Sequence, residues 1–186
     1  SAIATRFAHF DLFRRGDSRR GFNTLHGPFR LGELDGHITA GDYRYTVESG
    51  SGKNRSRTTY RVSYIVVRPD LTLRATLSLR TENLFDKLAG AMGFDDIDFE
   101  SAAFSKRFHV KCSDKKLAYD LFDPRMMEWM LQDPPPPLQL AAGEMLIHVG
   151  TRRWDVSDFE HHIAWVREFF EKWPGHLVRW LAEPHR

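Results

Sequence analysis

Three segments in the first half of the chain alternate hydrophobic and polar residues with a period of two, and this pattern limits the possible fold most strongly. They are residues 43–47 (YRYTV), 60–66 (YRVSYIV) and 71–80 (LTLRATLSLR). This alternation predicts β-strands, because successive side chains of a strand point to opposite faces of a sheet. The stretch ESGSGKNRSR predicts a hairpin loop, and Pro69-Asp70 a second turn. We therefore expect three antiparallel strands in a meander.

Helix signals dominate the second half of the chain. Asn83 is expected to cap a short helix that ends at Gly93. Further helices are expected to begin after Ser113 or Asp114 and after Asp123, which is followed by a proline suited to a first helical position. These signals predict three short helices before the C-terminal region.

The remaining segments predict strands and one longer helix. Residues 96–113 (DIDFESAAFSKRFHVKCS) are strand-like with a polar middle that indicates a bend, and residues 138–157 predict a strand pair. The last helix has the clearest signal, because Ser157-x-x-Glu160 fits a capping box and hydrophobic residues recur at steps of three and four up to Trp173. A further short helical turn is expected after it.

The expected order is β-β-β-α-β-α-α-β-β-α, which is typical of the α+β class. We predict a mostly antiparallel sheet with helices packed on one face and a long C-terminal helix; a sheet curled into a half-barrel is a second form of this pattern. The prediction for residues 1–186 is a single domain. Residues 1–28 are expected to be irregular, with a loop at 14–23, and residues 133–137 (DPPPP) to form a proline-rich linker inside the domain.

Positive charge is concentrated in the first part of the chain. The first 80 residues contain 14 Lys and Arg against 7 Asp and Glu, and the rest contain 13 against 18. A basic half can bind anionic lipid headgroups or nucleic acid, although a solvated face explains the same charges. Nucleic acid is less favoured, because no aromatic-basic cluster of a known nucleic-acid module accompanies them. The candidate anion-binding residues are Arg14, Arg15, Arg19, Arg20, Lys53, Arg55 and Arg57.

The single cysteine is interpreted as a structural residue. Strand alternation places Cys112 on one face with Phe108 and Val110, and His109 on the other. A nucleophilic cysteine needs a base within hydrogen-bonding reach, so the pattern favours a small buried hydrophobic residue. One cysteine also excludes an internal disulfide framework and a four-cysteine zinc site.

An enzyme remains an alternative, with a site assembled from Asp96, Asp98, Glu100 and His109. The three carboxylates would line one strand face, and they could act as an acid/base pair or hold a cation. A solvated face is the competing interpretation. This alternative requires the four side chains to converge in a concave pocket.

Metal-binding patterns are weak. Glu160, His161 and His162 are consecutive, and residues that fan about 100° apart on a helix do not chelate as an i, i+4 pair does. The other histidines weighed as ligands are far apart in the sequence: His26, His37, His109 and His148. No cofactor, metal or catalytic residue is therefore predicted.

The stretch FSKRFHVKCSDKKLAYDLFDPRMMEWML, together with GDYRYTVESGSGKNRSRTTYRVSYIVV and NLFDKLAGAMGFDDIDFES upstream, resembles a family of uncharacterised bacterial proteins. The resemblance covers about residues 7–131. It implies a cytosolic domain that often follows N-terminal membrane helices. It implies no activity, because the family has no assigned reaction or catalytic residues.

The expected function is a soluble, non-enzymatic interaction domain of a bacterial protein, cytoplasmic and tethered to the inner membrane by a segment outside this chain. Its expected partner is a protein or an anionic membrane surface. No run of 18 apolar residues occurs in the sequence, so the sequence predicts no transmembrane helix. The anion-binding module and the enzyme remain the two alternatives.

Overall fold

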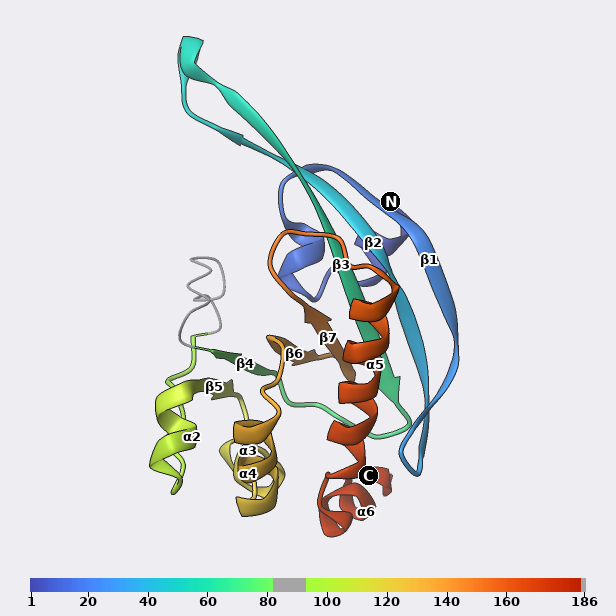
Figure 1. Ribbon diagram of the computed structural model, residues 1–186, viewed down its shortest axis with the longest axis vertical. Coiled ribbons are helices and arrows are strands. Elements are labelled where there is room, and N and C mark those ends of the chain that lie inside the picture. The colour runs from blue at the N-terminus through green and yellow to red at the C-terminus, as the bar shows by residue number, and fades with distance from the viewer. Residues whose placement is uncertain (82–92, 185–186) are drawn as a thin grey trace.

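The computed structural model describes residues 1–81 and 93–184. Within them, one antiparallel sheet has the strand order β1-β2-β3-β7-β6-β4-β5 (Figure 1). The strands are β1 (Asp17–Leu31), β2 (Leu34–Ser49), β3 (Ser56–Pro69), β4 (Leu77–Thr81), β5 (Phe108–Cys112), β6 (Leu138–Ala141) and β7 (Glu144–His148). The helices are α1 (Ala2–Arg6), α2 (Ala102–Arg107), α3 (Lys115–Leu121), α4 (Pro124–Gln132), α5 (Val156–Glu171) and α6 (Gly175–Ala182). Two short 3-10 helices are η1 (Asp11–Arg14) and η2 (Gly52–Asn54).

The predicted α+β class with an antiparallel sheet is confirmed, and the sheet is not curled. β1 and β5 are its two edge strands, so the sheet is open. The last helix predicted from the sequence is α5, and the short turn expected after it is α6.

Hydrophobic side chains cover both faces of the sheet, because the inner strand β3 alternates between two cores. Ile65 and Val67 belong to the larger core, and Tyr64 and Val66 to the smaller one. We name the two sides the α5 face and the α1 face. Helices α2 to α6 all contribute side chains to the core on the α5 face, as predicted for helices on one face. α1 and η1 pack on the opposite side, which the sequence did not indicate.

Side-chain caps explain where several helices begin. Asp114 accepts a hydrogen bond from the Leu117 backbone N–H at 3.2 Å, and Asp123 accepts one from Met126 at 2.8 Å, as expected from the sequence. The cap of α5 lies two residues earlier than predicted. There Asp155 and Asp158 form a reciprocal capping box, whereas the sequence had indicated Ser157 and Glu160.

One loop prediction and two strand predictions are wrong in part. Residues 14–23, expected to be a loop, include the start of β1, so much of residues 1–28 is regular structure. Only the end of segment 71–80 pairs as β4, and the part before Leu77 runs without strand pairing. Segment 96–113 contains α2 before β5, because Ser101 caps a helix where the sequence had indicated a bend.

Three further predictions concern a short helix, the proline-rich linker and membrane-spanning helices. The helix predicted to start at Asn83 lies outside the described residues. Residues 133–137 run between α4 and β6 without helix or strand structure. In the part of the chain that is described, no helix combines the length and the apolar character needed to cross a bilayer.

Candidate anion-binding surface on the hairpin arm

The β2–β3 hairpin is longer than the rest of the sheet. Its strands pair without interruption from Gly36 opposite Pro69 to Ser49 opposite Ser56. β1 pairs with β2 only as far as Thr46, so residues 47–58 form a two-stranded ribbon beyond the three-stranded region. We call residues 47–58 the hairpin arm. The arm projects from the body of the molecule, and all of its residues are exposed (Figure 1).

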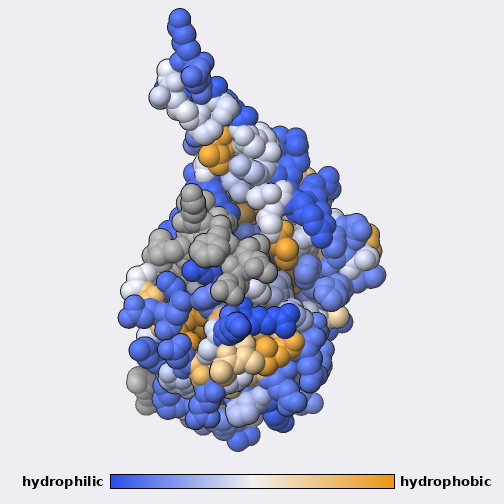
Figure 2. All heavy atoms as spheres, turned by 60° about the vertical axis from the view of Figure 1, so that its left-hand side comes forward, coloured by the Kyte–Doolittle hydropathy of each residue, from blue (hydrophilic) through white to orange (hydrophobic). Residues whose placement is uncertain are grey.

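Basic residues crowd the tip of the arm. Lys53 lies in η2 and Arg55 directly follows it, and neither forms an ion pair with another described residue. Arg57 is partly neutralised, because its Nε lies 3.2 Å from Glu48 Oε1 across the two strands. The space-filling view shows the arm as predominantly hydrophilic (Figure 2). The tip therefore presents positive charge on an element that buries no hydrophobic core.

The turn at the tip needs a glycine. Gly50 has φ +88°, and a Cβ atom at this position would lie 2.2 Å from the backbone oxygen of Asn54. Any other residue would clash and would hold a left-handed backbone conformation that L-residues rarely adopt. This glycine lets the chain fold back tightly and bring Lys53 and Arg55 to the end of the ribbon.

The other candidate residues predicted from the sequence do not form one cluster. Arg14 pairs with Asp11 inside η1, which reduces its charge. Arg19 Nη1 lies 3.4 Å from the backbone oxygens of both Phe13 and Arg14 on the α1 face. Nearby, Tyr43 donates to the Phe13 oxygen at 3.1 Å, and burial raises the pKa of Tyr43 to about 12. Arg14 and Arg19 thus help to hold η1 in place. Arg15 follows η1 directly as its C-cap residue.

Arg20 lies on the other side of the sheet, where it forms part of a row across three strands. Arg20 of β1 is directly opposite Arg44 of β2, and Arg44 is directly opposite Arg61 of β3. Directly paired residues share a face, and Phe22 and Asp42, the next pair along, lie beside Arg153 of the loop before α5. We call Arg20, Arg44 and Arg61 the arginine row.

Sequence analysis missed Arg44 and Arg61 as members of a site. Each was seen as the polar partner in an alternating strand, and Arg44 lies between two tyrosines. What links them to Arg20 is the register of the three strands, which cannot be read directly from the sequence. Once the hairpin is centred on residues 49–56, the pairing of Arg44 with Arg61 follows by counting along the two strands.

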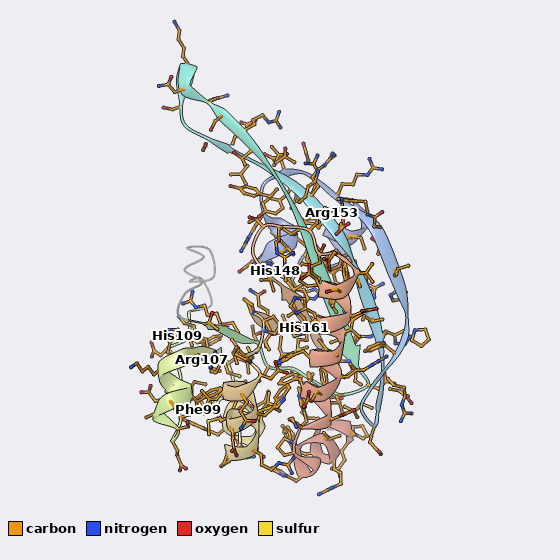
Figure 3. All side chains as sticks on the ribbon, in the orientation of Figure 1. Phe99, Arg107, His109, His148, Arg153 and His161 are labelled. Atoms are coloured by element: carbon orange, nitrogen blue, oxygen red, sulfur yellow. The ribbon has the colours of Figure 1, made fainter. Side chains whose placement is uncertain are left out.

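Two further arginines border the arginine row, but both are paired. Arg152 forms two hydrogen bonds to Asp158, at 2.9 and 3.1 Å, and the Arg152 hydrogen bond lowers the pKa of Asp158 to about 2. Arg153 contacts the buried Asp42 carboxylate through Nε at 3.0 Å and Nη2 at 2.9 Å. Figure 3 shows Arg153 beside the strands near the N-terminal end of α5.

The structure confirms the interpretation of Cys112. Its side chain is buried in the larger core, and burial raises the pKa of the thiol. His109 points to the opposite face of β5, where its Nδ1 lies 3.1 Å from Asp96 Oδ2. The thiol and the imidazole are therefore not arranged as a nucleophile with its base.

The acidic residues of the enzyme alternative do not converge. Asp96, Asp98 and Glu100 are exposed and alternate with the buried Ile97 and Phe99. Asp96 reaches His109, whereas Asp98 uses its backbone oxygen to accept from the Tyr119 hydroxyl at 3.2 Å. Figure 3 shows Phe99 and His109 close to α2, at the opposite sheet edge from β1.

The described cavities lie elsewhere. One of about 240 Å³ is lined by residues 72–75, by Asp114 and Leu117, and by Trp180 and Leu181 of α6. A second, of about 410 Å³, is formed by residues 68–73 with the β6–β7 turn and the end of α6. Across the described ranges, no three His, Cys, Asp or Glu side chains group as metal ligands.

Comparison with known proteins gives one likeness in fold. No family model matches the chain. No curated protein matches it either. The fold is similar to the crystal structure of the mycobacterial trehalose monomycolate transport factor A, TtfA, with a TM-score of 0.56 and 12% sequence identity over 99% of this chain and 86% of that one. The family resemblance seen in the sequence therefore stays a prediction, and the likeness to a bacterial protein's fold is an observation.

Proposed function

We propose that this chain is a non-enzymatic docking domain that binds an anionic membrane surface through the hairpin arm and serves a transport process, as the name of the transport factor TtfA states for that protein. The domain would act at the cytoplasmic face of the inner membrane. The proposal joins the similarity in fold, which extends over 99% of the chain, to the basic surface described above.

The observation that carries the proposal is the arm itself. Residues 47–58 contribute nothing to either hydrophobic core, yet they extend the β2–β3 hairpin well beyond the end of its neighbouring strand β1. A long two-stranded ribbon in water is marginal in stability without a packing partner. Its tip carries Lys53, Arg55 and Arg57 against a single carboxylate, Glu48. Docking on an anionic surface gives this element a use for both its length and its charge.

The expected strength of this contact is modest. Each Lys or Arg close to an anionic leaflet contributes about 1 kcal/mol at physiological salt, so the three tip cations supply ~3 kcal/mol at most. The Arg57 contribution is smaller, because Glu48 already neutralises part of its charge. Binding through the tip is therefore reversible and strongly dependent on ionic strength.

The test measures co-sedimentation of the protein with vesicles. We expect binding to phosphatidylcholine vesicles that contain phosphatidylglycerol, little binding to phosphatidylcholine alone, and a steep loss between roughly 50 and 200 mM salt. The triple substitution Lys53→Gln, Arg55→Gln, Arg57→Gln should remove most of the binding while leaving the melting temperature unchanged, because all three side chains are exposed.

The matched control removes the same charge from another surface. The substitutions Lys106→Gln, Lys115→Gln and Arg125→Gln change three exposed residues, one in each of α2, α3 and α4. They should leave vesicle binding close to that of the unaltered protein. Equal losses in both triple variants would mean that only net charge matters, and the arm would then have no special role. Binding to duplex DNA without binding to anionic vesicles would overturn the proposal in favour of nucleic acid.

A further inference from the structure

We propose that the arginine row is a phosphate-recognition site, which makes the docking domain select phosphate-bearing headgroups among anionic lipids. The inference rests on the proposed membrane docking for the source of the phosphate. It assigns a different task to a different group of residues: the tip supplies general attraction, and Arg20, Arg44 and Arg61 supply chemical selection.

The first support is geometric. Neighbouring strands lie about 4.8 Å apart, and directly opposite residues have Cβ atoms about 5 Å apart. Arg20, Arg44 and Arg61 are paired in register on three adjacent strands, so their side chains rise side by side from one face. Like charges placed directly opposite each other destabilise a sheet. Three in a row therefore represent a cost that an anion bound between them would offset.

The second support is that these three guanidinium groups are not neutralised. No Asp or Glu oxygen among the described residues lies within 4.0 Å of their nitrogens. Three other arginines near the row do have carboxylate partners: Arg57 pairs with Glu48, Arg152 with Asp158 and Arg153 with Asp42. Two acidic residues lie in the adjacent rows by register. Asp42 is already paired with Arg153, and Asp17, opposite Thr46, is exposed.

The third support comes from what borders the row. Toward the tip, the hydroxyl oxygens of Thr46 and Thr59 are 3.1 Å apart, so one donates to the other and polar groups continue along the same face. Toward the body, Asp42 is fully occupied by Asn23, Ser63 and Arg153 and does not turn to the row. The row is thus a cationic strip held between two polar pairs that are already satisfied internally.

The chemistry of arginine selects the ligand. A guanidinium presents its N–H donors as a rigid planar fork that matches two oxygens of a phosphate, and lysine offers only a point charge. Arg20 and Arg61 are exposed, Arg44 is half-buried, and neither described cavity includes them. An open strip suits a headgroup presented on a surface better than a small molecule that requires enclosure. A single carboxylate can satisfy one fork, whereas a phosphate group can bridge two neighbouring ones.

The test replaces arginine by lysine, which keeps the charge and removes the fork. Vesicles contain phosphatidylcholine with either phosphatidic acid or a diacylglycerol hemisuccinate, matched in surface potential. We expect the unaltered protein to prefer the phosphate lipid about tenfold, as charge-assisted hydrogen bonds allow. The variant Arg20→Lys, Arg44→Lys, Arg61→Lys should bind both vesicles equally. The control variant Arg68→Lys, Arg125→Lys, Arg179→Lys should keep the preference, because these exposed residues lie away from the arm.

A second measurement works without membranes. Titration with inorganic pyrophosphate is followed by the NMR signals of the arginine Nε–H groups. We expect saturable shifts for the unaltered protein and no saturation for Arg44→Gln combined with Arg61→Gln. Pyrophosphate binding without any vesicle binding would contradict the membrane function and leave a soluble phosphate compound as the ligand. Vesicle binding with equal preference for both lipids, and no response to pyrophosphate, would overturn the arginine row and leave the docking function intact.

Discussion

Asp42 lies on β2 with 3% of its surface exposed, and its carboxylate accepts hydrogen bonds from three residues. Ser63 donates at 2.5 Å, Asn23 at 2.9 Å, and Arg153 at 3.0 Å through Nε. Ser63 in turn accepts from the Trp154 backbone N–H at 2.8 Å. This network joins β1, β2 and β3 to the loop that leads into α5, so it fixes the loop beside the arginine row.

We expect Asp42→Ala to lower the free energy of unfolding by about 2–4 kcal/mol. Removal of a buried carboxylate leaves its former donors without a partner, and the cost is moderated because Arg153 is half exposed and regains water. Urea unfolding at neutral pH measures the change. Glu160→Ala, an exposed position on α5, serves as the control and should change stability by less than about 0.5 kcal/mol. The double variant with Arg153→Ala should cost less than the sum of the two single ones, and strict additivity would refute the coupling.

Asp158 gives a prediction for pH. The Arg152 hydrogen bond, and then the Asp155 backbone hydrogen bond, lower the pKa of Asp158 from 3.8 to about 2. A carboxyl whose folded pKa lies below its unfolded value contributes stability above the unfolded pKa and loses it as the pH falls through the folded one. The stability difference between the unaltered protein and Asp158→Asn should therefore be constant above about pH 5 and shrink between pH 4 and 2. Unfolding curves across that range measure it, and a difference that grows with acidity would contradict the assignment.

Among the elements, β1 shows best why some strands escape sequence analysis. It is an edge strand of 15 residues, and most of its side chains are exposed or half-buried on both faces. Two register irregularities, between Asp17 and Arg20 and between Phe22 and Leu25, break any period of two. No hydrophobic alternation remains to be detected, and Gly16 and Gly21 interrupt a polar segment, so residues 14–23 were predicted to be a loop.

The opposite error occurred before β4. Leu71, Leu73 and Ala75 alternate as strand residues do, but they pack against the core beside α6, and the Thr72 N–H donates to the Leu181 oxygen at 2.9 Å. Alternation of hydrophobic and polar residues shows only that one side of a segment is buried. An unpaired segment that packs against a helix gives the same pattern as a paired strand. α2 escaped for a related reason, because a helix of six residues is decided by its Ser101 cap more than by periodicity.

The hairpin arm should be separable from the rest of the sheet. We expect replacement of residues 47–58 by an Asn-Gly turn to leave the melting temperature and the denaturant m-value close to those of the full chain, because the arm buries no core residue. Vesicle binding should fall with it. Thermal unfolding and co-sedimentation measure the two effects. A large loss of stability would mean that the arm is structural, and retained binding would place the membrane contact elsewhere.

At the scale of the whole molecule, the sequence predicted those features that depend on residues close together in the chain. The class, the β2–β3 hairpin, the caps at Asp114 and Asp123 and the burial of Cys112 all follow from residues close together in the sequence. The arginine row depends on three strands meeting in one register, and the joining of Asp42 with Arg153 spans 111 positions. Such pairings are set by the fold as a whole, so the candidate site was recognised only as a basic region.

One pairing divides the sheet into an early and a late part. β3 meets β7 through residues 64–67 and 145–148, so the chain must close a gap of about 80 residues to form this contact. During synthesis, β1, β2 and β3 have been translated before β7, so the edge of β3 that pairs with β7 is still unpaired. An open hydrophobic edge is a hazard for aggregation, and flanking positive charges are a recognised protection against it. We therefore expect the excess of Lys and Arg in the first 80 residues to keep the nascent half-sheet in solution until its partner strand has left the ribosome.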